Sequence, residues 1–360
     1  MPGSPPTLFH RFQLGLWREV SALSLSGPTA GLALRTSVAT VLSVVLALFL
    51  HLDNPAWAGI TALAIIQQDV ASSLLRSVDR CLGTIVGAVI GYFSARLVAH
   101  HLLFELICAA ATTFAIYGGE RSRHGYAVLL GAVTVILVMF GSLETPDATI
   151  SIAVYRCLEI LVGVAVSCAV DYAFGPARTG APAAAKPGIF GKPVDLSLLG
   201  IALTGGIATA AIPAIWETLQ LPGLGQTPVT AFVIIIAMRK EPAWTAANRL
   251  AGCVLGGMYG LLGMRLAGDD LLAWLLIMFA GLYAATFVKH GKGDAAYSGH
   301  QAAIAILMAM VQGFAPSPDI LPAINRLAGI FGGILVVAVA QVVLAPLVAR
   351  VLAFLFGKRA

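Results

Sequence analysis

Long, unbroken apolar segments constrain the fold of this chain more than any other feature of its sequence. The segments 36–50 and 329–347 are typical, because neither contains a charged residue. The whole chain of 360 residues is 59% hydrophobic and 11% charged, whereas soluble domains are about a quarter charged. So few charged residues cannot cover the surface of a water-soluble protein. The bilayer must therefore be the solvent for most of the chain. This disfavours a soluble enzyme, a nucleic-acid-binding domain and a secreted disulfide scaffold.

The apolar segments favour α-helices over β-strands. A membrane β-barrel has segments of about ten residues in which polar and apolar side chains alternate, and these segments do not alternate. Helices also satisfy every backbone hydrogen bond in lipid, so we predict an all-α polytopic membrane protein. The 5 cysteines lie in apolar segments without Cys-x-x-Cys spacing, which predicts core residues and no disulfide framework or metal site.

Charged residues and helix breakers divide the chain into twelve candidate spans, since a span needs roughly 20 apolar residues. A first membrane repeat, 29–174, contains the predicted spans 29–51, 55–70, 78–98, 102–118, 124–142 and 149–174. A second repeat, 197–349, contains the spans 197–217, 226–239, 247–267, 271–289, 297–314 and 323–349. Outside the repeats we predict a cytoplasmic N-terminal segment (1–28) without a removed signal peptide, a Pro/Ala/Gly-rich cytoplasmic linker (175–196) and a basic cytoplasmic tail (350–360).

The distribution of Lys and Arg predicts the orientation. With the N-terminus inside, all but four of the 22 Lys and Arg residues are cytoplasmic. The four on the outer side are Arg96, Arg156, Arg265 and Arg326. The positive-inside rule therefore predicts that both termini are cytoplasmic and that the number of spans is even. This asymmetry accounts for the net charge of +5 without a nucleic-acid partner.

Residues 79–91 recur as residues 248–260, which predicts an internal duplication. The recurring positions, at an offset of 169 (249 − 80), are Arg80, Gly83, Gly87 and Gly91, which match Arg249, Gly252, Gly256 and Gly260. At an offset of 170 (326 − 156), Arg156 and Gly163 match Arg326 and Gly333. We predict two parallel six-helix repeats related by an axis along the membrane normal. The glycine stripes are expected to pack helices closely.

Four short motifs, in this order, resemble those of the fusaric acid resistance family, the aromatic acid exporters of the bacterial inner membrane. They are Pro55-Ala-Trp57-Ala58-Gly-Ile-Thr61, Gln67-Gln68, Arg80-Cys-Leu-Gly83-Thr84-Ile-Val-Gly87 and Arg156-Cys-Leu-Glu159-Ile160-Leu-Val-Gly163. The resemblance is sharpest over 30–176 and weaker over 197–346, which lacks the first two motifs. Many family members carry a large cytoplasmic domain, and this sequence has only a short linker between its halves.

The resemblance implies efflux of aromatic or related organic acids, driven by the proton gradient, and some family members work with a periplasmic adaptor protein. An uncoupled anion channel on a related scaffold is the alternative. A membrane enzyme is a third hypothesis, and the sequence shows no paired His/Asp constellation that favours it. We expect no cofactor, and no ATP hydrolysis because the P-loop pattern GxxxxGK[ST] is missing. A homo-oligomer remains open.

Two short predicted spans suggest a binding site for the carboxylate of an organic anion. Asn54-Pro55 and Thr227-Pro228 resemble helix starts, with a capping residue followed by proline at the first helical position. A helix that begins inside the protein would present free N–H groups to an anion. Trp57 or Thr61, together with Thr230, would line that site. The alternative is an ordinary helix start at the outer interface, with Trp57 as an interfacial aromatic residue.

Charged residues inside the spans are further candidates. Arg156 and Arg326 lie on the side where cations are disfavoured, so we consider them candidate anion ligands. Glu159 follows Arg156 by three residues and shares its helix face, which makes it the candidate proton-coupling group. A structural ion pair between Arg156 and Glu159 is the alternative.

Candidates on the cytoplasmic side are Arg80, Arg249 and Gln67. Both arginines stand near the starts of their predicted spans, where they are candidate anion ligands or positive-inside anchors. Gln67 stands near the end of a span and is expected to line an aqueous path, because an unpaired amide in lipid is costly.

Overall fold

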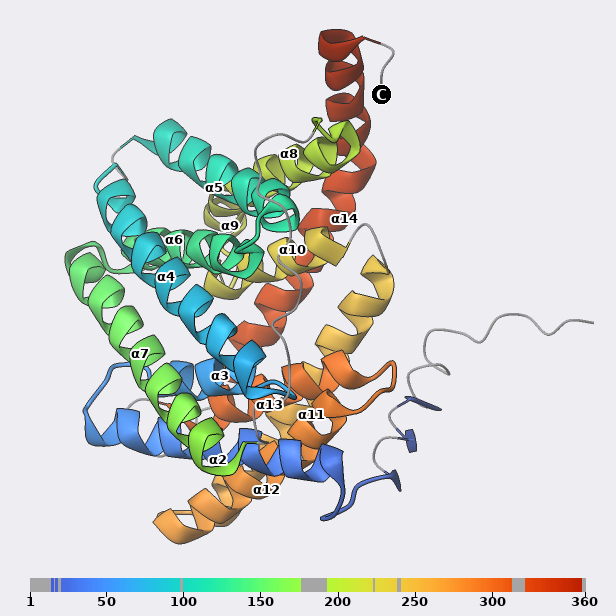
Figure 1. Ribbon diagram of the computed structural model, residues 1–360. Coiled ribbons are helices and arrows are strands. Elements are labelled where there is room, and N and C mark those ends of the chain that lie inside the picture. The colour runs from blue at the N-terminus through green and yellow to red at the C-terminus, as the bar shows by residue number, and fades with distance from the viewer. Residues whose placement is uncertain are drawn as a thin grey trace, which may run out of the picture. The chain divides into compact units, whose positions relative to one another are not determined.

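The computed structural model describes residues 14–15, 17–18, 21–97, 100–175, 193–222, 224–237, 241–312 and 321–357. All the regular structure in these ranges is helical (Figure 1). Most of the predicted linker, 176–192, lies outside them, as do the first residues of the N-terminal segment and the last of the tail.

Each predicted span corresponds to a helix or a pair of helices. The first half contains α2 (Pro28–Phe49), α3 (Ala56–Ile65), α4 (Val70–Ala95), α5 (His101–Arg121), α6 (Gly125–Glu144), the 3-10 turn η1 (Pro146–Ala148) and α7 (Thr149–Phe174). The second half contains α8 (Leu196–Ala210), α9 (Ile212–Leu219), the 3-10 turn η2 (Leu224–Gln226), α10 (Thr227–Ile236), α11 (Pro242–Ala267), α12 (Leu271–His290), α13 (Ala296–Met310) and α14 (Leu321–Phe356).

The prediction of an all-helical membrane fold is confirmed. Among the described residues, nine helical segments are long and apolar enough to cross a membrane. Helices α3 and α10 are apolar but have only ten residues each, about half the length that a span needs. The count of twelve spans therefore stays a prediction.

Two boundaries differ most from the predicted ones. Helix α4 begins at Val70, eight residues before the predicted start, because the Asp69 carboxylate accepts the Ser72 N–H at 2.7 Å and caps the helix. This backbone hydrogen bond lowers the pKa of Asp69. The first turns of α4 are polar, so apolarity alone placed the start too late. Helix α14 continues to Phe356, seven residues past the predicted end of the last span (356 − 349).

Contacts group the chain into two compact units, which we describe separately. Unit 1 comprises Met1–Ser77, Leu158–Ala181 and Ala243–Ile324, and unit 2 comprises Val78–Cys157, Pro182–Pro242 and Asn325–Ala360. Each unit therefore combines helices from both halves of the sequence. In unit 1, α2 packs against α3 and α12, and α13 packs against α3 and α12 (Figure 1). In unit 2, α5 packs against α6 and α8.

The turns after α2 and α9 have the same backbone geometry. His51 has a φ of 53° and Gln220 a φ of 50°, in the left-handed region that non-glycine residues seldom adopt. In each turn the next N–H donates to a carbonyl five residues earlier, as in a Schellman motif. These bonds join Leu52 to Ala47 at 3.0 Å and Leu221 to Trp216 at 3.2 Å. All the matched positions differ by 169 (220 − 51, 221 − 52, 216 − 47).

The glycine stripes bring helices into close contact in both units. In unit 2, a β-carbon on Gly83 or Gly87 of α4 would collide with the Ala127 or Gly131 carbonyl oxygen of α6. In unit 1, a β-carbon on Gly252 or Gly256 of α11 would collide with the Ser298 or Ala302 carbonyl oxygen of α13. The contacted positions differ by 171 (298 − 127, 302 − 131). The matching contacts support the duplication, while the arrangement of the halves about an axis stays a prediction.

Two adjacent glycines of α11 test this close packing. A β-carbon on Gly256 would lie 2.7 Å from the Ala302 Cα, whereas a β-carbon on Gly257 meets nothing within 4 Å. We expect Gly256→Ala to lower the free energy of unfolding by about 1–3 kcal/mol, because the backbone of α13 must move. Gly257→Ala should leave it unchanged or raise it by up to about 1 kcal/mol, since alanine favours helix. Thermal unfolding in detergent measures both, and equal melting temperatures would contradict the packing described.

Candidate functional site

Helix α3 is buried inside unit 1, and polar side chains of other helices contact its two ends. Eight of its ten residues are buried, and the segment Ala-Trp-Ala-Gly-Ile-Thr-Ala-Leu-Ala-Ile is almost entirely apolar. Pro55 precedes the helix, and Ile66 ends it with extended backbone. The N–H groups of the first turn and the carbonyls of the last have no partners within the helix. At the N-terminal end the Trp57 and Ala58 N–H groups donate to the Asn54 and Pro55 carbonyls just before the helix, at 2.9 and 3.1 Å. Side chains from other helices also contact the two ends.

At the N-terminal end of α3 the partner is a carboxylate from α7. The Asn54 N–H donates to Glu159 Oε1 at 2.8 Å, and the Glu159 side chain is buried. A negative charge at this end of a helix is stabilised by the helix dipole. The site predicted for an organic anion therefore holds an anion of the protein itself.

The predicted capping roles of Asn54 and Thr227 are wrong. The N-cap of α3 is Pro55, without a side-chain capping bond, and Asn54 is exposed and contributes its backbone N–H. Thr227 is the first residue of α10, directly after η2, and not the residue before the helix. A local sequence pattern could not show that a carboxylate 105 residues away would take the place of the Asn54 side chain at α3.

At the C-terminal end of α3 the chain folds back on itself through Gln67. The Gln67 side-chain amide donates to the Ile66 carbonyl at 2.9 Å, and the Gln67 backbone N–H donates to Ser73 Oγ at 2.9 Å. Gln67 thus closes the end of the helix, and no described contact sets its side chain along a path for solutes.

Two cations reach the carbonyls at this end. The Arg35 guanidinium, from α2, donates to the Gln67 carbonyl, and the Lys289 ammonium, from α12, donates to the Leu63 carbonyl. Positive charges at the C-terminal end complement the helix dipole in the same way that Glu159 complements the N-terminal end. The neighbouring helix α2 and the distant helices α7 and α12 therefore all contact the ends of α3 through ionisable side chains.

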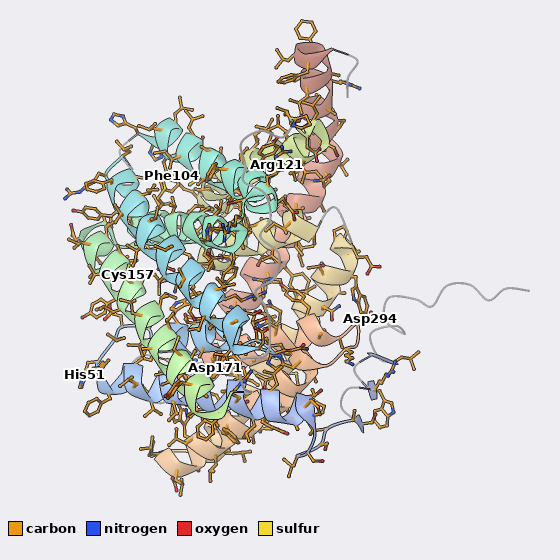
Figure 2. The ribbon with its side chains drawn as sticks, in the orientation of Figure 1. His51, Phe104, Arg121, Cys157, Asp171 and Asp294 are labelled. Carbon is orange, nitrogen blue, oxygen red and sulfur yellow. The ribbon has the colours of Figure 1, made fainter. Side chains whose placement is uncertain are left out.

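Arg35 also forms a buried ion pair with Asp171 of α7. The Arg35 Nε lies 3.1 Å from Asp171 Oδ1, and the two side chains are 5% and 2% exposed. Figure 2 shows Asp171 near the end of α7, beside α2. Ala62, Ile66 and Val170 form a buried apolar cluster in the same part of the unit. Loss of one partner would leave the other as an uncompensated buried charge.

A pocket of about 680 Å³ lies against this ion pair. Asp171 is part of its wall, together with Ser73 and Ser77 of α4 and the apolar residues Ile65 and Leu74. All the lining residues belong to unit 1. The volume lies within the range of small-molecule sites, about 300–1,000 Å³.

Trp57, Thr61 and Thr230 have packing contacts. Trp57 packs on a buried apolar cluster with residues from α2, α3, α11, α12 and α13. Thr61 is fully buried, and a β-carbon on Gly163 of α7 would lie 2.6 Å from its Cβ. Thr230 is buried in the same way, and a β-carbon on Gly333 of α14 would lie 2.7 Å from its Cβ. The two threonines thus have matching helix contacts in units 1 and 2.

Arg80 and Arg249 lie deeper in their helices than predicted. Arg80 is the eleventh residue of α4 and Arg249 the eighth of α11, and both are buried. In unit 2 the Arg80 guanidinium donates to the Tyr126 hydroxyl at 3.1 Å, and in unit 1 Arg249 donates to the Tyr297 hydroxyl at 3.2 Å. The placement at helix starts was wrong because α4 and α11 begin before their apolar segments do.

The structure groups only some of the predicted site residues. Arg156 is half-buried, eight residues into α7, and Arg326 is buried near the start of α14. Unit 1 contains Asn54, Trp57, Thr61, Gln67, Glu159 and Arg249, and unit 2 contains Arg80, Arg156, Thr230 and Arg326. The residues gathered around α3 are Asn54, Trp57, Thr61, Gln67 and Glu159.

Sequence reasoning missed Arg35, Asp171 and Lys289. Asp171 lies inside the predicted span 149–174, and an ionisable residue within a span is a functional candidate by default. That signal could have found it. Arg35 and Lys289 also lie inside predicted spans, 29–51 and 271–289, but were counted only as cytoplasmic charges.

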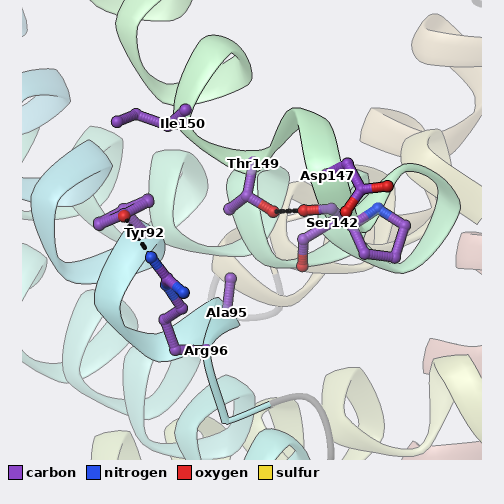
Figure 3. A pocket seen from close by; sticks show the side chains of 8 residues that line it. Tyr92, Ala95, Arg96, Ser142, Asp147, Thr149 and Ile150 are labelled. Atoms are coloured by element: carbon purple, nitrogen blue, oxygen red, sulfur yellow. Dashed lines mark hydrogen bonds between the residues drawn. The ribbon is translucent and has the colours of Figure 1, made fainter.

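A second pocket, of about 320 Å³, lies in unit 2 between the ends of α4 and α6 and the start of α7 (Figure 3). Arg96 donates to the Tyr92 hydroxyl at 2.9 Å, and its guanidinium carbon lies 5.4 Å from the centroid of the tyrosine ring. Asp147 and Thr149 also line the pocket. Arg96 is exposed, so water reaches this cation at the helix end. Among the described residues, no group of three or more His, Cys, Asp or Glu side chains could hold a metal ion.

The apolar helices and the charges buried among them define a multi-pass membrane protein. Residues 29–187 match the fusaric acid resistance protein family, and residues 205–340 match a fusaric acid resistance protein-like family. The chain belongs to the fusaric acid resistance family.

Three similar proteins illustrate the range of relatives. The p-hydroxybenzoic acid efflux pump subunit AaeB of Musicola paradisiaca is 25% identical over 275 residues, which cover 70% of this chain and 41% of the relative. An uncharacterized transporter of Gluconobacter oxydans is 26% identical over 47% of this chain and 24% of its own length. The Escherichia coli K12 AaeB is 28% identical over 40% of this chain and 24% of its own length. The matches thus span less than half of each relative, and no solved structure matches the chain.

The contact at the start of α3 can be tested by two substitutions of Glu159. We expect Glu159→Ala to lower the free energy of unfolding by about 1–3 kcal/mol, because the Asn54 N–H loses its acceptor. Glu159→Gln keeps an acceptor oxygen and should cost less. Asn54→Ala retains the N–H and is the control, with a melting temperature close to that of the wild type. An Asn54→Ala variant as unstable as Glu159→Ala would show that the Asn54 side chain holds the helix after all.

Proposed function

We propose that the protein is a secondary transporter of the bacterial inner membrane that exports organic anions, aromatic carboxylic acids in particular, coupled to the proton gradient. Membership of the fusaric acid resistance family supports this proposal. So do the relatives named as p-hydroxybenzoic acid efflux pump subunits. In this proposal both termini are cytoplasmic, and the partners are the substrate, the lipid bilayer and a periplasmic adaptor protein.

The observation that carries the proposal is the buried helix α3, with charged side chains at both ends. Glu159 contacts the N-terminal end, and Arg35 and Lys289 contact the C-terminal end. Secondary transporters build substrate and ion sites at the ends of helices that stop within the membrane. Ionisable groups inside a membrane are costly and are retained where ions or substrates pass.

Glu159 remains our candidate for proton coupling. Its protonation would remove a negative charge from the N-terminal end of α3 and weaken a charge-assisted hydrogen bond. Proton uptake would thereby loosen the attachment of α3 to α7. In this proposal the buried cations Arg80, Arg249 and Arg326, with Arg156, attract the anion along its path, and Trp57 offers an aromatic surface.

An uncoupled anion channel is the competing function, and reconstituted protein distinguishes the two. We expect liposomes containing the purified protein and loaded with p-hydroxybenzoate to take up labelled p-hydroxybenzoate by counterflow. A pH gradient should drive net flux even when the electrical potential is clamped at zero. A flux that follows the electrical potential alone would favour the channel, and the lack of any specific uptake would contradict both functions.

Two arginines predicted to lie on the outer side provide a matched test of the transport path. We expect Arg156→Ala to reduce p-hydroxybenzoate counterflow at least tenfold, a change equivalent to about 1.4 kcal/mol, because Arg156 is half-buried within α7. Arg96→Ala should retain nearly full activity, because Arg96 is exposed and bonds locally to Tyr92. The measurement is the initial rate of p-hydroxybenzoate counterflow at equal amounts of reconstituted protein. Equal rates for the two variants would exclude a special role for Arg156.

A further inference from the structure

In unit 1, Asp171 lies next to both the pocket and Arg35. Asp171 is part of the pocket wall, and the Arg35 Nε lies 3.1 Å from the Asp171 carboxylate, while Arg35 itself is not part of that wall. Asp171 therefore belongs both to the pocket wall and to the ion pair with Arg35. An anion in the pocket would have to displace Asp171 to pair with Arg35.

We infer that Arg35 binds the carboxylate of the substrate and that Asp171 is an internal anion that occupies Arg35 until the substrate displaces it. This inference rests on the proposed function, since it assigns the site at which the exported aromatic carboxylate is bound. It concerns binding alone, and no covalent bond is formed or broken.

The chemistry of Arg35 suits a carboxylate. A guanidinium is always charged, and its planar N–H groups can donate to both oxygens of a carboxylate at once. One donor of Arg35 is used by the Gln67 carbonyl, which fixes the side chain at the end of α3. The edge that faces Asp171 is then held in place for whichever carboxylate is present.

Asp171 is held weakly enough to be displaced. Its side chain is 2% exposed, and Arg35 is the cation with which it forms an ion pair. A buried ion pair gains little net energy over the cost of its desolvation. Exchange of one carboxylate for another conserves the charge at Arg35, so it avoids the penalty of leaving the cation unpaired.

The rest of the pocket fits an aromatic acid. Ile65 and Leu74 provide apolar surface for a ring, and the buried Ser73 and Ser77 provide hydroxyl groups for a polar substituent. The matching positions of the other half, at offsets of 169 (204 − 35) and 170 (341 − 171), are Thr204 and Gln341. Neither carries a charge, so the chain has one such site and not two.

Other charged groups near the pair have partners elsewhere. Lys289 donates to the Leu63 carbonyl, and His290 bonds to the Thr36 hydroxyl at 2.9 Å. Asp69 caps α4 at Ser72, and Arg76 donates to the Ala64 carbonyl at 3.4 Å. Asp171 is thus the acidic group that faces Arg35.

Binding of p-hydroxybenzoate to the full chain, measured by calorimetry in detergent at neutral pH, tests the exchange. We expect Asp171→Asn to bind the probe about tenfold more tightly than the wild type, because the competing carboxylate is gone. Arg35→Gln should lose binding. Since that variant leaves Asp171 uncompensated and can fail to fold, the double variant Arg35→Gln/Asp171→Asn is measured with it. The double variant should melt close to the wild type and still bind nothing.

A matched control is Asp79→Asn. Asp79 also contacts a basic side chain, since its carboxylate lies 2.8 Å from His124 Nδ1, but it is in unit 2 and does not line the pocket. Its substitution should leave p-hydroxybenzoate binding unchanged. An effect of Asp79→Asn equal to that of Asp171→Asn would show a general response to lost negative charge and would overturn the inference.

The outcomes distinguish the inference from the proposed function. If the wild type binds the probe and shows counterflow, but the double variant binds as the wild type does, the site is wrong and the transporter remains. If binding depends on Arg35 and Asp171 as expected and counterflow is lacking, the site stands and the proposed function fails. If the wild type neither binds nor transports the probe, both are overturned.

Discussion

A polar group inside an apolar interior must find a partner there, and the short helix α3 concentrates this requirement at its two ends. Its free N–H groups and carbonyls cannot reach each other. The protein meets the requirement with charge: Glu159 at one end, and Arg35 and Lys289 at the other. These side chains come from α7, α2 and α12, so the same contacts that satisfy α3 also fix three long helices around it. The Arg35–Asp171 pair, and the pocket beside it, follow from this constraint.

Much of the helical fold could be predicted from the sequence, because apolar runs of spanning length have few alternatives in lipid. The short α3 and α10 and the close packing of the glycine stripes follow from local patterns of the same kind. The partners of the charged residues do not. Arg35 and Asp171 are 136 positions apart (171 − 35), and no local spacing indicates that they meet. The prediction that the Asn54 side chain caps α3 was wrong for the same reason. The contact at this end is made by Glu159, which lies on the distant helix α7.

The packing framework recurs in both halves of the chain, whereas the Arg35–Asp171 site does not. The left-handed turns at His51 and Gln220 recur in the two halves of the chain, as do the glycine contacts of α4 and α11. The ion pair does not recur, because Thr204 and Gln341 replace its members. The packing positions are therefore shared by both halves, as are the matched arginines Arg80 and Arg249, whereas the Arg35–Asp171 pair occurs in the first half alone.

The most direct test of the account is an experimental structure of the full chain with p-hydroxybenzoate bound. The account predicts that the carboxylate of the ligand lies against the Arg35 guanidinium, with Asp171 turned away from it and the ring between Ile65 and Leu74. A ligand bound elsewhere, with the Arg35–Asp171 pair intact, would contradict it.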